Sequence, residues 1–100
     1  MIYPHMLIGI RCVEVKMETQ DYGDESSWTL SHCSNDETYG NYQEYITQCC
    51  LSPGNYTLEC KDSYGDGWNG GYIEVDGVKY CESYYSGTVM TSEIMIQGRG

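Results

Sequence analysis

The six cysteines of this 100-residue chain constrain its fold more than any other feature. They are even in number, irregularly spaced and without a C-x-x-C pair, which favours disulfides over a zinc site. They are Cys12, Cys33, Cys49, Cys50, Cys60 and Cys81. A short chain with this many cysteines is typical of an oxidising compartment, so we expect an extracellular or cell-surface location.

The spacing of the cysteines leaves several disulfide pairings open. Cys49 and Cys50 are neighbours, and in an extended strand their side chains point to opposite faces, so we expect them to have different partners. Among the remaining possibilities we favour a bond between Cys60 and Cys81. The chain therefore predicts a small domain in which disulfides supplement a modest core.

Two other features bear on the compartment. Asn55 begins an N-glycosylation sequon, which is consistent with secretion. The first residues, MIYPHMLIGIRC, lack a basic region, and Pro4 and His5 interrupt their apolar run, so they are a poor signal peptide. If the protein is secreted, we expect its export signal to have been removed or to lie outside this chain. No run approaches the ~20 apolar residues that a membrane-spanning helix needs, so membrane insertion is not expected.

Apolar and polar residues alternate along several short segments, as they do in half-buried strands. Val13, Val15 and Met17 share one face of the first segment, and Asp76-Gly77 is a strong two-residue hairpin signal. Segment 42–49 is ambiguous with a short helix, but its β-branched and aromatic residues favour a strand. The other predicted strands are 26–33, 56–61, 71–75, 78–82 and 88–96.

These segments predict an all-β, antiparallel β-sandwich of jelly-roll or related topology, because about seven short strands alternate with turns and no helix is indicated. The alternative is a small, irregular fold held by disulfides. We expect one sandwich domain over residues 13–97. Residues 1–12 form an apolar arm that we expect to dock as a strand, either on its own sheet or on the edge of another copy.

The net charge of −10 excludes some partners. An acidic surface repels phosphates, so nucleic acid and anionic membranes are not expected to bind. Cations are the natural partners of such a chain.

Two acidic loops could provide a cation site. The segment DSYGDGWNGG, residues 62–71, is too rich in glycine for a helix, and a similar Tyr-Gly-Asp occurs at residues 22–24. If the strands before the two loops run in the same direction, both loops lie at one end of the sandwich. The expected metal ligands are then Asp21, Asp24, Glu25, Asp62 and Asp66. So many carboxylates need a counter-ion, and Ca²⁺ is the cofactor that fits an oxygen-only set.

The second loop is not an EF-hand, although its D-x-x-x-D-G spacing resembles part of one. Tyr64 occupies the expected third ligand position, Ile73 stands where the bidentate Glu should be, and no helices flank the loop. The alternative to a metal site is that the aspartates only accept hydrogen bonds from their own backbone, as in Asx-turns.

The two acidic loops also resemble motifs of a known family. Residues 19–28 are similar to a T-x-D-x-Y-G-x-E-x-S-W motif and residues 62–71 to a D-S-Y-G-D-G motif, with a C-L-x-x-G-x-Y-T-L approach at residues 50–58. In this the chain resembles secreted, CUB-like β-sandwich modules of microbes, algae and marine invertebrates, over about residues 13–82. Departures are the tight Asp21-Tyr22 spacing and the extra cysteines Cys12, Cys60 and Cys81. The resemblance implies an accessory, adhesive or matrix domain without a settled activity.

The aromatic residues are eleven tyrosines and two tryptophans, with no phenylalanine. Side chains with an apolar body and a polar tip suit binding faces, although a small sandwich can also use tyrosine simply to fill its core and rim. For a sugar-binding function the expected contact residues are Tyr64, Trp68 and Asn69.

Catalysis has little support in the sequence, and we do not expect an enzyme. His5 and His32 are the only histidines, and neither lies in a nucleophile or metalloprotease motif. Glycoside hydrolysis needs two carboxylates across a substrate cleft, for which a sandwich of this size has hardly any room.

Together these features predict an extracellular structural or adhesive module stabilised by calcium. It would contact other extracellular proteins or identical copies through the arm and its tyrosine-rich faces, and could build a fibre or matrix. The alternative is a calcium-dependent carbohydrate-binding module, and a small hydrolase is a distant third.

Overall fold

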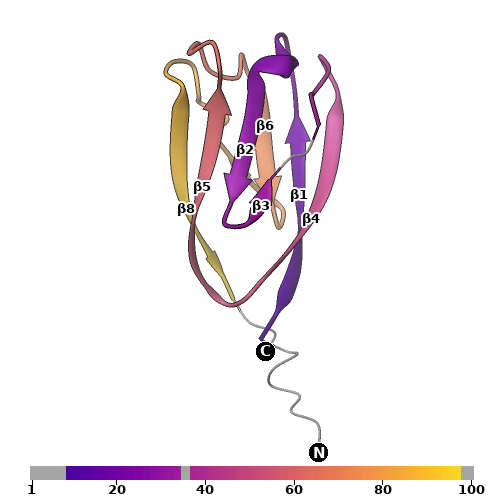
Figure 1. The fold of residues 1–100 in the computed structure, drawn as a ribbon, viewed down its shortest axis with the longest axis vertical. Coiled ribbons are helices and arrows are strands. Elements are labelled where there is room, and N and C mark those ends of the chain that lie inside the picture. Colours follow the sequence, from indigo (N-terminus) through magenta and orange to yellow (C-terminus); the bar gives the residue numbers. More distant parts are fainter. Residues whose placement is uncertain (1–8, 35–36, 98–100) are drawn as a thin grey trace, which may run out of the picture.

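Eight strands form two four-stranded antiparallel sheets that pack face to face (Figure 1). The structure is a computed structural model that describes residues 9–34 and 37–97. One sheet has the strand order β4-β1-β6-β7 and the other β3-β2-β5-β8. The strands are β1 (Arg11–Glu18), β2 (Ser26–Leu30), β3 (Cys33–Ser34), β4 (Glu44–Leu51), β5 (Gly54–Asp62), β6 (Tyr72–Val75), β7 (Val78–Tyr80) and β8 (Val89–Ile96). The predicted antiparallel β-sandwich is confirmed.

The alternating pattern of the sequence decides which face of each strand is buried. Val13, Val15 and Met17 of β1 point into the core and are at most 2% exposed, as their spacing predicted. The ambiguous segment 42–49 is a strand from Glu44 on: β4 begins two residues later than predicted, ends at Leu51 and pairs with β1 along its whole length. Trp28 and Leu30 of β2 complete the opposite wall of the core.

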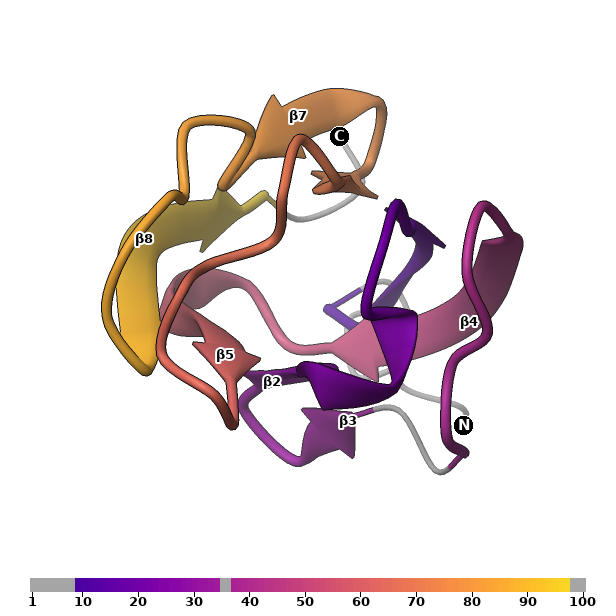
Figure 2. The ribbon, with the colours of Figure 1, turned by 90° about the horizontal axis from the view of Figure 1, so that it is seen from above.

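Successive strands run in opposite directions, so the connections fall at two ends (Figure 1). The segments 19–25, 37–43, 63–71 and 81–88, which we call the loop end, all lie at the end toward which β1 and β5 run (Figures 1 and 2). The predicted Asp76-Gly77 hairpin turns away from the loop end, beside the middle of β1, and its two residues have φ of 53° and 83°. The condition for bringing the two acidic loops together is therefore met.

Three disulfides use all six cysteines. Cys12–Cys50 joins the neighbouring strands β1 and β4, whereas Cys33–Cys49 and Cys60–Cys81 each connect one sheet to the other. The different partners of Cys49 and Cys50 are confirmed, as is the bond between Cys60 and Cys81.

An amino-terminal arm was predicted for residues 1–12, and its residues 1–8 lie outside the described residues. Its last two residues, Arg11 and Cys12, belong to β1. In the described part of the chain, no helix has the length and apolar character needed to cross a membrane.

Candidate metal centre

The last residue of β5, Asp62, organises the loop that follows it. Its Oδ2 atom accepts three backbone hydrogen bonds, from the N–H groups of Gly65 at 2.9 Å, Asp66 at 2.6 Å and Gly67 at 2.8 Å. Asp62 itself is only 1% exposed. The Asx-type backbone capping considered as the alternative to a metal site therefore exists, but it uses only one of the two carboxylate oxygens.

The other oxygen of Asp62 belongs to a cluster of three carboxylates. One oxygen each from Glu25, Asp62 and Asp66 lies within 4.8 Å of the other two. Glu25 Oε1, Asp62 Oδ1 and Asp66 Oδ1 are all buried, and no hydrogen-bond donor of the described residues reaches them. Leaving a buried charged oxygen unpaired is unfavourable, so the cluster needs a proton or a cation.

The backbone holds this carboxylate cluster from three segments of the loop end. Glu25 closes the 3₁₀ turn η1 (Gly23–Glu25), and its carbonyl accepts a hydrogen bond from the N–H of Ser63 at 3.0 Å. Asp66 forms a parallel bridge with Gly87, whose N–H donates to the carbonyl of Gly65 at 2.8 Å. The three carboxylates are thus placed by contacts distant in sequence.

Gly67 shows how closely these segments approach. Its φ is 81°, and a Cβ at this position would overlap the carbonyl oxygen of Tyr84 and lie 2.7 Å from the Cα of Tyr85. Only glycine accepts this backbone conformation and this contact without strain. The glycine at position 67 is therefore explained by its close approach to Tyr84 and Tyr85.

The three carboxyl groups differ in their pKa values. Burial, followed by the charges of Asp62 and Asp66, raises the pKa of Glu25 above its ordinary value. A hydrogen bond to Asp62, which exists only while Asp66 carries a proton, is the first cause that raises the pKa of Asp66, and burial is the second. Burial alone would raise the pKa of Asp62, but the hydrogen bonds from Asp66 and from the backbone N–H groups outweigh burial, so the pKa of Asp62 is lowered. Without a cation, the first proton is therefore lost most readily from Asp62, and the loss of a proton from Glu25 or Asp66 is less favourable than for an ordinary carboxyl group.

No basic side chain of the described residues forms an ion pair with the carboxylate cluster. The ion pairs in this part of the chain join Arg11 to Asp76, Lys16 to Glu44 and Glu74, and Lys61 to Glu59. Lys61 precedes Asp62, but its ammonium lies 3.5 Å from Glu59 Oε1. Neutralisation of the cluster must come from a proton or from a bound cation.

Comparison with known proteins adds no identification. No protein-family profile, curated protein or solved structure matches the chain. The resemblance to CUB-like modules stays a prediction, and the functional argument depends on the geometry of the carboxylate cluster and its surroundings.

Two of the five predicted metal ligands lie outside the carboxylate cluster. Asp21 and Asp24 are both exposed. The backbone carbonyl of Asp21 accepts a hydrogen bond from Asn69 Nδ2 at 3.3 Å, and its side chain bonds the Tyr42 hydroxyl, which raises the pKa of that phenol. Asp24 acts on the cluster only through its charge, which contributes to the raised pKa of Glu25.

The three residues predicted to contact a sugar differ in their exposure. Tyr64 is 76% exposed and available to a partner. Trp68 is 2% exposed, its Nε1 donates to the carbonyl of Lys61 at 2.8 Å, and its ring packs against Tyr84 with centroids 5.7 Å apart. A sugar ring cannot reach this indole, so Trp68 is a core residue rather than a contact residue. Asn69 is exposed, with its amide donating to Asp21.

The sequence analysis did not identify a group of tyrosines at the loop end. The tyrosines that are exposed in the described residues all lie there, one in each of its four segments: Tyr22, Tyr42, Tyr64 and Tyr85. They could have been found by noting that each follows a strand that runs toward this end. Asn55, the predicted glycosylation site, is exposed on β5.

Proposed function

We propose that this chain is an extracellular, non-enzymatic structural or adhesive module whose loop end is held together by a bound Ca²⁺. The observation that supports the proposal is the convergence of three carboxylates, each with one buried and unpartnered oxygen. An acidic cluster alone would be weak support, but Asp62 is 1% exposed and keeps an unpartnered oxygen that faces no donor. A cation satisfies all three oxygens at once.

Calcium fits this set of oxygen ligands better than other common metals. It accepts carboxylate, carbonyl and water oxygens in flexible geometry, whereas Mg²⁺ requires a near-ideal octahedron. Zinc and copper favour nitrogen and sulfur ligands. All six cysteines are in disulfides, and His32 lies in the β2–β3 turn, at the end of β2 away from the cluster.

The proposed ion has a structural role. Glu25 belongs to the connection between β1 and β2, Asp62 is the last residue of β5, and Asp66 belongs to the connection between β5 and β6. Both connections cross from one sheet to the other. A cation bound to all three residues would join the two crossovers. The loop end would then be a rigid platform from which the exposed tyrosines contact a partner.

A calcium-dependent carbohydrate-binding module is the second candidate function. The exposure of Tyr64 and of the other three tyrosines around the loop end favours it, because tyrosine rings stack on sugars and their hydroxyls form hydrogen bonds. Glycan binding that depends on Tyr64 would support this candidate over a purely structural role.

Calcium is expected to raise the melting temperature. A ligand at about 100 times its Kd adds about 2.7 kcal/mol to the free energy of unfolding, and about 1 kcal/mol shifts the melting temperature of a domain of this size by roughly 4–8 °C. Thermal unfolding followed by circular dichroism, with calcium and with EGTA, should therefore show a shift on the order of 10 °C or more.

Two variants of equal charge change provide the control. Glu25→Gln removes one carboxylate of the cluster and should abolish most of the calcium-dependent shift. Asp24→Asn removes the neighbouring exposed carboxylate and should retain it. An equal response of both variants, or a melting temperature that calcium does not change, would contradict the proposed site.

A further inference from the structure

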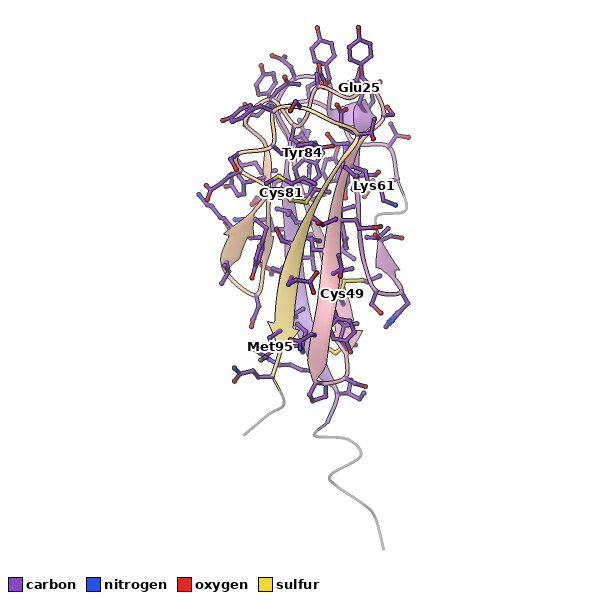
Figure 3. All side chains as sticks on the ribbon, turned by 90° about the vertical axis from the view of Figure 1, so that its left-hand side faces the viewer. Glu25, Cys49, Lys61, Cys81, Tyr84 and Met95 are labelled. Carbon is purple, nitrogen blue, oxygen red and sulfur yellow. A yellow bond between two sulfur atoms is a disulfide. The ribbon has the colours of Figure 1, made fainter. Side chains whose placement is uncertain are left out.

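The free edge of β8 is one of the two longest sheet edges of the described structure. β8 is the last strand of the sheet β3-β2-β5-β8. Its residues 89–96 pair with β5 on one side, and no described strand pairs with the other side. Figure 3, which views the molecule from the β8 side of Figure 1, shows no other strand in front of β8. Its outward backbone groups are therefore open to pairing with another strand.

The sequence of β8 lacks the features that usually protect an edge. It contains no lysine, arginine, proline or glycine, and its single charge, Glu93, accepts a hydrogen bond from Thr57 Oγ1 at 2.9 Å. Val89 is 49% exposed and Met95 62% exposed. A long, apolar edge of this kind favours association with another strand.

The other three edges are less suited to pairing. β3 has two residues and β7 has three, which is too short for a stable ladder. β4 is as long as β8, but its carboxyl end is tied to β3 of the opposite sheet by the Cys33–Cys49 disulfide, and Cys33 Sγ lies 3.9 Å from the Gln48 carbonyl oxygen. β8 has the same length and carries no disulfide.

We propose that the partner of this edge is β8 of a second copy, paired antiparallel about a two-fold axis, so that two sandwiches share one continuous sheet. Opposite residues in an antiparallel ladder must point to the same face. Val89, Thr91, Glu93 and Met95 alternate with inward-facing neighbours and all point outward. Placing Ser92 opposite Ser92 of the second copy satisfies this rule.

This register also matches the chemistry of the outward face. It places Val89 opposite Met95 of the second copy, so that two exposed apolar side chains cover each other twice in the dimer. It places Glu93 opposite Thr91, which repeats the Thr–Glu hydrogen bond that Glu93 already makes with Thr57. The edge is thus complementary to itself, which is what an interface with two-fold symmetry requires.

The competing register of similar length is disfavoured by charge. It would place Glu93 opposite Glu93, and like charges directly opposite destabilise a strand pair. The overall charge of −10 opposes any self-association, but at 0.15 M ionic strength it is screened beyond about 8 Å, and β8 contributes only one charge. The pairing supplies a partner for the proposed structural module, and its biological role rests on that proposed function. The pairing itself does not require calcium.

Disulfide trapping tests both the partner and the register. All six native cysteines are paired, so one added cysteine per chain supplies a single new thiol. When Val89→Cys and Met95→Cys chains are mixed under mild oxidation, the proposal predicts a cross-linked dimer, because opposite residues lie about 4.5–5.5 Å apart at Cα. Each variant alone should remain largely uncross-linked. Thr91 and Met95 are opposite each other only in the competing register and are diagonal in the proposed one. A mixture of Thr91→Cys and Met95→Cys should therefore also remain largely uncross-linked.

The native chain provides the second measurement. Analytical ultracentrifugation in EGTA at 0.15 M salt should show a dimer that Met95→Lys weakens, since the charge would face Val89. A wild-type monomer at every concentration up to about 100 µM, or equal cross-linking in the two mixtures, would overturn the proposal. A dimer in EGTA combined with no thermal response to calcium would contradict the metal site and support the β8 pairing. A monomer with a clear thermal response to calcium would contradict the β8 pairing and support the metal site.

Discussion

Trp68→Ala is expected to lower the free energy of unfolding by about 3–5 kcal/mol, the range for removal of a buried indole. The side chain is 2% exposed although it lies in a glycine-rich loop, and it packs on Tyr84. The substitution also removes the hydrogen bond from Nε1 to the carbonyl of Lys61. Because Lys61 directly precedes Asp62, calcium affinity should fall together with stability.

Urea unfolding of Trp68→Ala and of a matched variant in the same loop measures this effect. Tyr64→Ala removes an aromatic ring that is 76% exposed, and it should change stability by less than about 0.5 kcal/mol. If Trp68→Ala were as stable as Tyr64→Ala, the indole would not be part of the core, and its earlier interpretation as a contact residue would have to be restored.

Removing the Cys60–Cys81 disulfide is expected to destabilise the protein by about 2–5 kcal/mol. Both cysteines are buried, at 0% and 4% exposed, and the bond joins β5 to the residue that follows β7 in the other sheet. The double variant Cys60→Ala with Cys81→Ala should therefore unfold at lower urea than the native chain. It should also respond more weakly to calcium, because Tyr84 and Gly87, which are hydrogen-bonded to residues 63–71, follow Cys81 closely.

The Cys12–Cys50 disulfide provides the comparison. Its cysteines are 38 residues apart against 21 for Cys60–Cys81, so the loss of chain entropy in the unfolded state is similar, within about 0.5 kcal/mol. Both Cys12 and Cys50 are exposed, and they lie on strands already paired by backbone hydrogen bonds. Removal of this bond should therefore destabilise the protein less. An equal or larger effect would show that packing around Cys60 and Cys81 contributes little.

Much of the fold could be predicted from local sequence, because burial in a sandwich follows a period of two residues. Val13, Val15 and Met17 indicated both the strand and its inward face, and the adjacent positions of Cys49 and Cys50 indicated separate disulfide partners. Segment 26–33 was wrongly predicted as a single strand: β2 ends at Leu30, and β3 begins at Cys33 after a turn in which Ser31 has φ of 57°. A pairing as short as that of β3 depends on its neighbours rather than on a local pattern.

The metal ligands were predicted only in part, because loop geometry depends on contacts distant in sequence. Tyr22 has φ of 60°, and the 3₁₀ turn after it buries part of Glu25 while Asp24 remains exposed. Trp68 turns inward because Gly67 approaches Tyr84 closely and the Trp68 N–H donates to the Tyr84 carbonyl at 2.9 Å. Neither the turn nor the approach leaves a local pattern that distinguishes Glu25 from Asp24 or a buried Trp from an exposed one.

Isothermal titration calorimetry with calcium tests the central proposal most directly. We expect the native chain to bind one Ca²⁺ per monomer, Asp24→Asn to bind with similar affinity, and Asp66→Asn to lose most of the affinity because it removes one charged oxygen donor from the carboxylate cluster. Absence of binding to the native chain, or equal binding by Asp24→Asn and Asp66→Asn, would contradict a calcium site at Glu25, Asp62 and Asp66.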